Sequence, residues 1–537
     1  MPIRPLTPEL IDPLRQQGIW LDTPLYRLVD AHAERTPDAL AVADQHERLT
    51  YAELVARSSA FARWLAAQDL PAGSIVASQT GNRVALAVTH LACNRADMTF
   101  LPLSTQWRRT ELESLLRRSG VAVLVLPPPY KGVDFFSMVE EMRSELPRLL
   151  HVGGSDGLEA DFDFDAVVRE AGPVVAPDRD PDLPGFITVT SGTTEIPRMS
   201  QWTDNNVSFL MRDYISAVEL RPGDVALAIA PANTGATGYL FPVLAPICAG
   251  AASILLEDWS PTAAVELLET EHATHAAAIP TQLVKMLQDP TVAQRDFSAV
   301  RVITSAGAPL TPDTAALTES SFGCVVSTVY GSTDGGVITL TRTSDPIDKR
   351  RTSVGCPVPG AELILLDAEG NTVDLGVTGE VVWRTPTKSC GYLGDDERTD
   401  AMFKDEGWYH SGDLGALDED GYLSIVGRSK DLIIRGGQNI SPLEIEQILA
   451  RHEAVSEVAV VGVPDPVFGE RACACVVVRA GAQLTLDEVI TFMKAQDVAP
   501  FKVPEMLELF DELPRTGAGK LSKVSMRSAV AERTAGR

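Results

Sequence analysis

The stretch TSGTTEIPR, from Thr190 to Arg198, ends the apolar run GFITVT and decides how the rest of the chain is interpreted. Its hydroxyl and glycine residues are typical of a loop that binds phosphate oxygens without net positive charge. By itself, a solvated loop is an equally good interpretation. The candidate phosphate-binding residues are Thr190, Ser191, Gly192, Thr193 and Thr194. An acid, Glu195, follows them at a place where a polyphosphate would meet like charge.

The length and charge of the chain limit its architecture and its partners. With 537 residues it exceeds the size of a single hydrophobic core, so we expect more than one domain. Its 46 Lys and Arg stand against 73 Asp and Glu, a formal net charge of −27. Nucleic acid is therefore disfavoured as a partner. A phosphate-bearing ligand has to be held by local dipoles and a few well-placed cations.

Cysteine usage and hydropathy suggest a cytoplasmic protein. The seven cysteines show no metal-site spacing, and Cys473 and Cys475 share a face of the strand-like run ACACVVV, where we expect them to pack. This usage fits a reducing cytoplasm. The N-terminal residues lack an apolar segment, and no run of about 18 apolar residues occurs. We therefore expect neither a signal peptide nor a membrane span.

Helical and strand-like patterns alternate over the first 420 residues. Leu54, Phe61, Trp64 and Leu65 form one helical stripe, and the strand-like GSIVAS follows. This alternation predicts an α/β fold with largely parallel sheets covered by helices. Two stretches, 127–133 and 151–184, are expected to be surface connectors. From about Gly421 the pattern changes to short strands and two helices, which predicts a small α+β unit ending in a frayed tail over 528–537.

Further motifs follow in a fixed order. In YGSTDGG, Tyr330 has a ring that can stack on a base, Gly331 follows it, and Thr333 and Asp334 can reach a phosphate and its magnesium ion. A simple turn is the alternative there. In GWYHSGDLG, Asp413 can accept hydrogen bonds from two ribose hydroxyls. Each motif is only moderately specific.

Two basic, glycine-containing motifs complete the series. GRSKDLIIRGG brings Arg428 and Lys430 close to a glycine pair, and PRTGAGK places Lys520 on a glycine-rich turn. The order and spacing of all these motifs are far more specific than any one of them.

Together, the motifs from LTYAEL at Leu49 to Lys520 resemble those of the adenylate-forming superfamily of acyl-CoA synthetases, standalone adenylation enzymes and luciferases. The resemblance implies a large N-terminal α/β domain with packed sheets and helices (1–427), a hinge (428–431) and a small mobile α+β C-terminal domain (432–537). It also implies two half-reactions. The first forms an acyl-adenylate and pyrophosphate from ATP and a carboxylic acid, with Mg²⁺ as a cofactor, and the second transfers the acyl group to CoA.

The resemblance assigns roles to residues of this sequence. The phosphate loop corresponds to Thr190–Arg198, Lys430 matches the hinge, and Lys520 matches the lysine that bridges the carboxylate and the α-phosphate. The adenine-flanking segment corresponds to Ala306, Gly307, Ala308 and Pro309. The remaining matches are Tyr330 to an adenine-stacking ring, Asp334 to a magnesium ligand, Asp413 and Arg428 to ribose contacts, and Gly436 and Gly437 to the glycine pair of the pantetheine tunnel.

The segment PANTGATGYLF, from Pro231 to Phe241, corresponds to part of the acyl pocket. Selection of an amino acid would require a buried carboxylate for the ammonium group, and this segment has none. The small, uncharged residues are Asn233, Thr234, Gly235, Ala236, Thr237 and Gly238. They predict a roomy pocket for a bulky, neutral carbon skeleton. The alternative is a turn, with selectivity set elsewhere.

Four positions depart from the superfamily pattern. Glu195 replaces a glycine, Arg198 a lysine, Asp204 often a histidine, and Asp334 a glutamate. Glu195 adds charge where the β- and γ-phosphates of ATP would lie, so we expect adenylation to be weak or lost while acyl transfer survives. The alternative is that Glu195 points into solvent and Arg198 balances its charge. A separate adenylating enzyme would then supply the adenylate, an arrangement that resembles the divided ligases of platensimycin- and platencin-type diterpenoid pathways.

Three alternatives remain open. The chain could be a full ATP-dependent acyl-CoA ligase, which the presence of Lys520 favours. It could also be a standalone activator that loads a carrier protein. A binding protein without turnover is disfavoured, because it would not need the residues of the thiol-transfer step.

Overall fold

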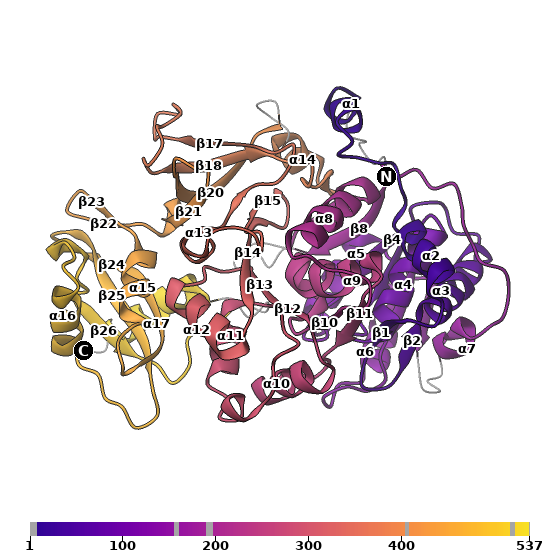
Figure 1. Cartoon of the computed structure of the whole chain (residues 1–537), viewed down its shortest axis with the longest axis horizontal. Helices are drawn as coiled ribbons and strands as arrows, with labels where there is room; N and C mark the ends of the chain where they lie inside the picture. Colours follow the sequence, from indigo (N-terminus) through magenta and orange to yellow (C-terminus); the bar gives the residue numbers. More distant parts are fainter. Residues whose placement is uncertain (1–7, 155–159, 190–196, 403–406, 516–520, 536–537) are drawn as a thin grey trace. The chain divides into compact units, whose positions relative to one another are not determined.

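The computed structural model describes residues 8–154, 160–189, 197–402, 407–515 and 521–535. It divides into two compact units. Unit 1 comprises the described residues of 8–189, 197–362 and 384–409, and unit 2 comprises 363–383 and the described residues from 410 onward (Figure 1). The hinge predicted at 428–431 falls inside unit 2. The hinge stays a prediction, because the division of the chain into compact units does not test whether the C-terminal domain rotates.

The larger sheet of unit 1 has nine strands among the described residues, in the order β16-β15-β14-β13-β12-β10-β11-β1-β2. The six strands from β14 to β1 are parallel, and β2, β15 and β16 run antiparallel to their neighbours. The bounds are β1 (Leu40–Ala43), β2 (Arg48–Thr50), β10 (Val225–Ala228), β11 (Ala252–Leu255), β12 (His275–Ala278), β13 (Val302–Ala306), β14 (Val325–Ser332), β15 (Gly336–Leu340) and β16 (Cys356–Pro357). Every residue of β11 and β12 is buried, as expected for strands covered on both faces.

The second sheet of unit 1 has the order β19-β9-β8-β4-β3-β5-β6-β7. Its strands all run in one direction except for β9, which is antiparallel to both of its neighbours, β8 and β19. The bounds are β3 (Ile75–Ser78), β4 (Thr99–Pro102), β5 (Val123–Leu126), β6 (His151–Gly154), β7 (Phe162–Asp163), β8 (Pro184–Val189), β9 (Met199–Thr203) and β19 (Gly391–Tyr392). Two parallel-rich sheets confirm the predicted α/β class for this part of the chain.

Helices of unit 1 begin where the sequence supplies caps. Thr50 and Glu53 form a capping box at the start of α3, whose buried stripe includes the predicted Leu54, Phe61 and Leu65. Helices α2, α3 and α4 pack against one another (Figure 1). The helices are α1 (Pro8–Gln16), α2 (Leu25–Arg35), α3 (Tyr51–Ala66), α4 (Val84–Arg95), α5 (Arg109–Ser119), α6 (Phe135–Met142), α7 (Phe164–Val168), α8 (Asp204–Ala217), α9 (Ala245–Ala249), α10 (Pro261–Thr270), α11 (Pro280–Leu287), α12 (Pro312–Phe322), α13 (Ile347–Thr352), α14 (Asp396–Met402), the 3₁₀ turns η1 (Arg143–Glu145), η2 (Ala232–Thr234) and η4 (Val292–Gln294), and the π-helix η3 (Ala236–Leu244).

Unit 2 contains two further sheets, and its first strands begin at the boundary with unit 1. The strand orders are β17-β18-β20-β21 and β23-β22-β25-β24, with β26 beside β25. The bounds are β17 (Glu362–Leu366), β18 (Gly379–Arg384), β20 (Tyr409–Leu417), β21 (Leu423–Arg428), β22 (Ile433–Arg435), β23 (Gln438–Ile440), β24 (Val455–Asp465), β25 (Gly469–Val478), β26 (Met506–Leu509), α15 (Pro442–Leu449), α16 (Leu486–Ala495), α17 (Lys523–Ala535), η6 (Ser429–Asp431) and η7 (Pro500–Lys502).

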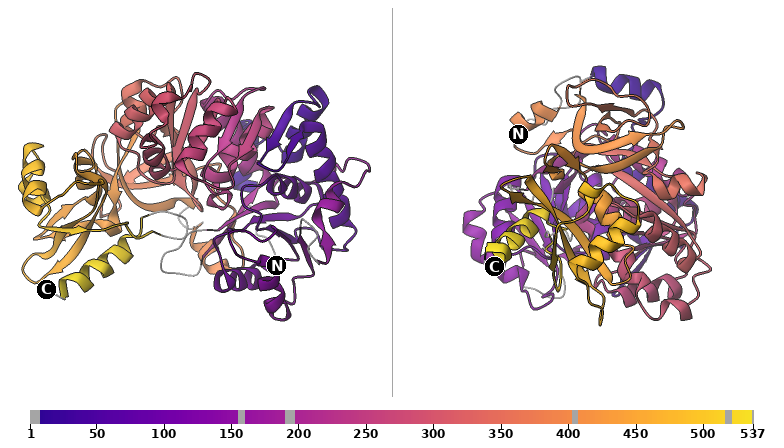
Figure 2. Two further views of the ribbon diagram at one scale, coloured as in Figure 1. Left: turned by 90° about the horizontal axis from the view of Figure 1, so that it is seen from below. Right: turned by 90° about the vertical axis from the view of Figure 1, so that its left-hand side faces the viewer.

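The faces of the last sheet are covered by different helices. Ile445 of α15 and Val489 of α16 belong to one core cluster, whereas Met526 of α17 packs in another cluster with Cys473 and Cys475. Figure 2 shows helices on both sides of this sheet, which is coloured orange to yellow. The two thiols are buried on one face of β25, which confirms the prediction that they pack. This strand and helix pattern confirms the predicted α+β character of the C-terminal part.

Two expectations for local structure are wrong. The stretch 151–184 was expected to be a connector, but it contains β6, β7 and α7, short elements whose glycines and acids conceal their pattern. The frayed tail expected over 528–537 is helical to Ala535. Two buried residues, Met526 and Val530, dock this helix on the sheet and stabilise a segment that has weak sequence signals.

Candidate active site

The predicted adenine-binding segments lie on two neighbouring parallel strands of unit 1. Ala306 ends β13 and pairs with Val329 of β14, and Tyr330 follows directly. Gly307 turns the chain with a φ of +86°, and Ala308 is exposed. Ligands of open α/β sheets bind at the carboxyl ends of such strands. The structure thus brings this segment and Tyr330 to one edge of the sheet.

Gly331 shapes the hairpin between β14 and β15. The strand register shifts between Tyr330 and Gly331. A Cβ atom at Gly331 would lie 2.3 Å from the carbonyl oxygen of Gly336, so a side chain does not fit there. The close backbone approach produces a tight turn that carries Ser332, Thr333 and Asp334.

Asp334, one of the predicted site residues, accepts five hydrogen bonds from described residues through its carboxylate. Its side chain is buried, with 5% of the residue exposed. Its Oδ2 atom accepts hydrogen bonds from the Tyr392 hydroxyl (2.5 Å) and from Arg198 Nη1 (3.2 Å). Its Oδ1 atom accepts hydrogen bonds from the Tyr409 hydroxyl (2.8 Å), the Ser332 hydroxyl (3.0 Å) and the Gly335 N–H (3.1 Å). We call Asp334, Arg198, Ser332, Tyr392 and Tyr409 the Asp334 cluster.

Electrostatics fixes the protonation of this cluster. Burial alone would raise the pKa of Asp334, but hydrogen bonds from Tyr392 and Tyr409 and the charge of Arg198 outweigh it and lower that pKa below its ordinary value. Burial and the charge of Asp334 raise the pKa of both tyrosines. At neutral pH the carboxylate is therefore ionised and the two phenols are neutral donors.

The superfamily resemblance implies a magnesium ligand at Asp334, and its surroundings do not fit one. A carboxylate offers about four lone-pair positions, and the donors above already fill them. Mg²⁺ demands near-octahedral oxygen ligands at about 2.0–2.1 Å, so it would have to displace several donors. No group of three or more His, Cys, Asp or Glu residues that could hold a metal occurs among the described residues.

A buried lysine lies close to the Asp334 cluster. The Nζ of Lys388 donates to the carbonyl oxygens of Met402 and Gly407, both at 2.7 Å. Burial lowers the pKa of Lys388 to about 8, although the charge of Asp334 acts in the opposite direction. The backbone N–H of the next residue, Ser389, donates to the Asp334 carbonyl oxygen at 3.2 Å. The segment around Lys388 is thus bonded to the same hairpin.

The predicted acyl-pocket residues form the entry to a rare π-helix. Asn233 and Thr234 lie in η2, Gly235 follows with a φ of +67°, and η3 begins at Ala236. Single π-turns are already uncommon and are frequent at functional sites. A Cβ at Gly235 would lie 3.6 Å from Thr188 Cγ2, an ordinary contact, so the positive φ is the constraint there. The segment is uncharged, as predicted, but whether it lines a pocket stays a prediction.

The remaining predicted residues of the described chain lie in unit 2. Asp413 and Arg428 face each other across β20 and β21, and Arg428 Nε donates to Asp413 Oδ1 at 2.5 Å. Asp413 is buried, whereas Arg428 and Lys430 are exposed. Gly436 and Gly437 form the two-residue turn between β22 and β23 with φ values of +54° and +81°. That turn type requires positive φ at both positions, which glycine adopts most easily.

Other predicted residues lie outside the described part of the chain. They are Thr190, Ser191, Gly192, Thr193, Thr194, Glu195 and Lys520. Conversely, sequence reasoning missed Tyr392, Tyr409 and Lys388. Tyr409 stands inside the motif GWYHSGDLG, from which only Asp413 was selected, and Tyr392 stands in the short GYLG. For Tyr392 the available signal was an aromatic beside a glycine, and for Tyr409 it was its place inside a motif that had already been singled out.

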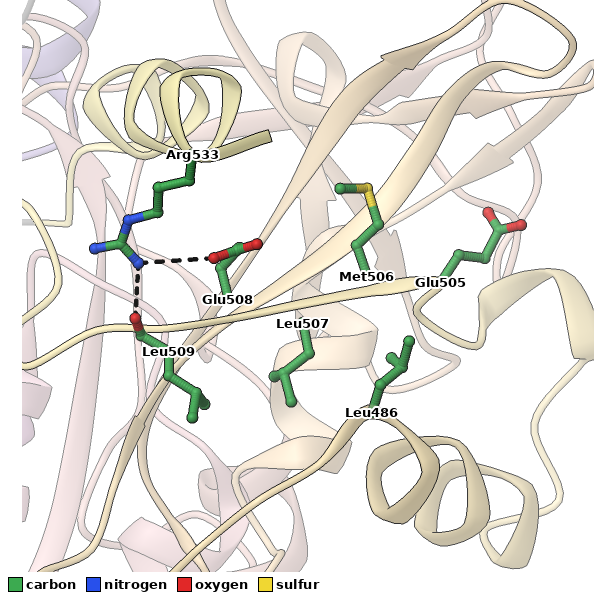
Figure 3. Close-up of a pocket in the computed structure, with 7 residues that line it drawn as sticks. All are labelled: Leu486, Glu505, Met506, Leu507, Glu508, Leu509 and Arg533. Atoms are coloured by element: carbon green, nitrogen blue, oxygen red, sulfur yellow. Dashed lines mark hydrogen bonds and ion pairs between the residues drawn. The ribbon is translucent and has the colours of Figure 1, made fainter. Parts of the chain in front are cut away.

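The hollow drawn in Figure 3 is unrelated to these residues. It lies in unit 2 beside β26, has a volume of about 710 Å³, and contains none of the predicted site residues. Arg533 Nη1 donates to the Leu509 carbonyl oxygen at 2.7 Å and lies 3.8 Å from Glu508. The hollow therefore does not serve as the candidate active site.

Comparison with known proteins assigns the chain to a family. The family model described as AMP-binding enzyme matches residues 29–393, and the AMP-binding enzyme C-terminal domain matches residues 444–520. The chain belongs to the AMP-binding enzyme family. Its relatives in this family include acyl-CoA ligases. The predicted family and the two-part fold are thereby confirmed.

Relatives of this AMP-binding enzyme match over nearly their whole length. It is 32% identical to medium-chain fatty-acid–CoA ligase of Escherichia coli K12, covering 97% of this chain and 92% of the relative. It is also 32% identical to salicylyl-CoA synthase / salicylate adenylyltransferase of a Streptomyces species, covering 98% and 97%. ATP-bound MatB from Rhodopseudomonas palustris superimposes with a TM-score of 0.85 at 29% identity, covering 96% of this chain and all of that structure.

Two general features of the AMP-binding enzyme complete the description. No helix of the described residues is long and apolar enough to cross a membrane. All seven cysteines carry free thiols.

Proposed function

We propose that this AMP-binding enzyme is an acyl-CoA ligase that transfers a bulky, neutral carboxylic acyl group from its acyl-adenylate to CoA, and that its ATP-dependent adenylation is weak or lost. The observation that carries the proposal is Glu195 within TSGTTEIPR. A like-charge contact at about 5 Å costs about 3 kcal/mol at an effective dielectric near 20. A side chain there also fills space that glycine leaves for a close backbone approach. Acyl-adenylate has no β- or γ-phosphate and avoids both penalties.

In the proposed reaction the CoA thiol gives its proton to solvent and its sulfur attacks the acyl carbonyl carbon. The bond between that carbon and the phosphate oxygen then breaks, and AMP leaves with the bonding electron pair. The mixed anhydride is already activated, so the protein mainly aligns thiol and carbonyl, an orientation effect worth several kcal/mol. Tyr330 and the Ala306–Pro309 segment would hold adenine, Asp413 and Arg428 the ribose, and Gly436 and Gly437 the pantetheine. The hinge at 428–431, which contains Lys430, would let the C-terminal domain (432–537) rotate between the two half-reactions.

A neutral acid is the proposed substrate class. The segment Asn233–Gly238 supplies no buried carboxylate for an ammonium group. Two relatives, a medium-chain fatty-acid–CoA ligase and a salicylyl-CoA synthase, are named for acids without an ammonium group, which supports this class. Ala236→Trp at the start of η3 is expected to abolish turnover of large acids before small ones. Gly235→Trp is a poorer test, because its φ of +67° would strain any side chain. An unchanged size preference in Ala236→Trp would remove this segment from the pocket.

The proposal predicts a split between the two half-reactions. For each protein, the rate of acid-dependent pyrophosphate exchange is divided by the rate of thioester formation from synthetic acyl-adenylate. This ratio should be at least tenfold lower in the unmodified protein than in the Glu195→Gly variant. Recovery of exchange in that variant supports the proposal. Brisk exchange in the unmodified protein would refute it. A separate adenylating enzyme would then be unnecessary.

A full ATP-dependent ligase is the second candidate. Lys520 within PRTGAGK favours it, because the lysine that bridges carboxylate and α-phosphate is needed for adenylation. A standalone activator that loads a carrier protein is tested by measuring which thiol accepts the acyl group. If only a carrier protein accepts it and free CoA does not, the carrier protein takes the place of CoA in the proposal. The free thiols of all seven cysteines support a cytoplasmic location.

A further inference from the structure

Asp334 links parts of unit 1 that are distant in sequence. It lies in the hairpin between β14 and β15 of the nine-stranded sheet, whereas Tyr392 belongs to β19 of the eight-stranded sheet. Arg198 directly precedes β9 of that second sheet, and Tyr409 starts β20. A single buried carboxylate therefore accepts hydrogen bonds from groups on both sheets of this unit.

A cation already neutralises Asp334. Arg198 Nη1 donates to Oδ2 and to the Tyr392 hydroxyl, both at 3.2 Å, and its guanidinium lies 5.5 Å from the centre of the Tyr392 ring. Charge-assisted hydrogen bonds of this kind are about twice as strong as neutral ones. A divalent cation at Oδ2 would have to replace the Tyr392 hydroxyl and lie beside a guanidinium of like charge.

We infer that Asp334 is the central acceptor of a hydrogen-bonded anchor for the β14–β15 hairpin and is not a divalent-cation ligand. Arg198, Tyr392 and Tyr409 are positioning residues that act through it. The anchor holds the hairpin at the turn after Tyr330, so it fixes the place of the proposed adenine-stacking ring. The inference is independent of the argument from Glu195, because the contacts that carry it are those of Asp334 with Arg198, Tyr392 and Tyr409.

The test compares nucleotide affinity in Mg²⁺ and in EDTA. AMP and ATP are titrated calorimetrically into the full-length protein and into Asp334→Asn, Asp334→Glu and Tyr392→Phe/Tyr409→Phe. An anchor predicts that all three variants lose at least fivefold in AMP affinity in EDTA as well as in Mg²⁺. The matched control is Tyr130→Phe, which removes a 2.6 Å tyrosine-to-Asp258 bond elsewhere in unit 1 and should change AMP affinity less than twofold.

A metal ligand predicts the opposite pattern. Mg²⁺ would raise nucleotide affinity at least tenfold in the unmodified protein, Asp334→Asn would abolish only that gain, and Asp334→Glu would retain it. This pattern overturns the inference. Pyrophosphate exchange can be brisk while the EDTA losses persist, in which case the proposed function fails and the inference stands.

Thermal unfolding in EDTA provides a second measurement when a variant binds no nucleotide. The anchor predicts a fall of several degrees in the melting temperature of unit 1 for Asp334→Asn and for the double tyrosine variant. The single variant Tyr392→Phe should show a smaller fall in the same direction. Unchanged melting in all of them contradicts the anchor.

Discussion

The two groups of candidate site residues are built in different ways. In unit 1, Asp334 is buried and accepts hydrogen bonds from two tyrosines, a serine and an arginine. In unit 2, Asp413 pairs with Arg428, whose side chain is 52% exposed, and Lys430 lies exposed in η6. A buried group with several partners cannot change them cheaply, whereas an exposed pair can. The difference suggests a fixed platform in unit 1 and adaptable contacts in unit 2.

The largest expected effect is the loss of the carboxylate at the centre of unit 1. Asp334→Ala leaves two buried phenols and the Arg198 guanidinium without this acceptor, so the free energy of unfolding of unit 1 should fall by about 3–5 kcal/mol. Urea unfolding followed by tryptophan fluorescence measures it. Asp258→Ala, which removes the exposed partner of Tyr130, is the control and should cost less than about 1 kcal/mol. Equal losses would remove the contrast between a buried cluster and an exposed pair.

The sequence predicted the site residues of unit 1 that share one motif, but it missed the residues of the Asp334 cluster that come from other parts of the chain. Tyr330 and Asp334 stand in one motif, so residue types and spacing suffice to find them. Tyr392 and Tyr409 lie 58 and 75 residues after Asp334 and reach it only because of the strand order of two sheets. That order depends on long-range packing, which a local pattern does not encode. The class of fold was predictable because helix and strand periodicities are local.

A second effect is a dependence of stability on pH. Folded Lys388 has a pKa of about 8 because of burial, against 10.5 in the unfolded chain. Between these values the unfolded state binds more protons, so the stability of unit 1 should rise with pH, by about 1–3 kcal/mol in total. Above pH 10 the raised pKa values of Tyr392 and Tyr409 act in the opposite direction, because the folded state then holds more protons.

Urea unfolding between pH 7.5 and 9.5 measures this rise. Lys388→Met removes the titrating group and should flatten the curve. The control is Lys285→Met, at a half-buried lysine of α11 whose ammonium lies 5.8 Å from the centre of the Trp259 ring. A rise of the same size in Lys388→Met would assign the effect to another group.

The third effect concerns the exposed turn η6 of unit 2, which contains Lys430. Lys430→Pro fixes φ in η6, so it should slow whichever half-reaction needs the rarer orientation of the small domain, by about tenfold or more. The free energy of unfolding should change little, because this exposed turn contributes few buried contacts. Thioester formation from synthetic adenylate and pyrophosphate exchange are measured separately. Equal loss of both, together with AMP binding, would indicate misfolding.

The smallest expected effect on stability is at the exposed partner of Asp413. Arg428→Ala should lower the free energy of unfolding by less than about 1 kcal/mol, because an ion pair with a half-exposed arginine gains little over its hydrated state. Its proposed contact with ribose should nevertheless matter for binding, so the affinity for acyl-adenylate should fall about fivefold or more. Arg48→Ala, which removes an ion pair between Glu271 and an arginine that is also 52% exposed, is the control for stability. If Arg428→Ala destabilises the protein as much as Asp334→Ala does, the two regions do not differ in the way their geometry indicates.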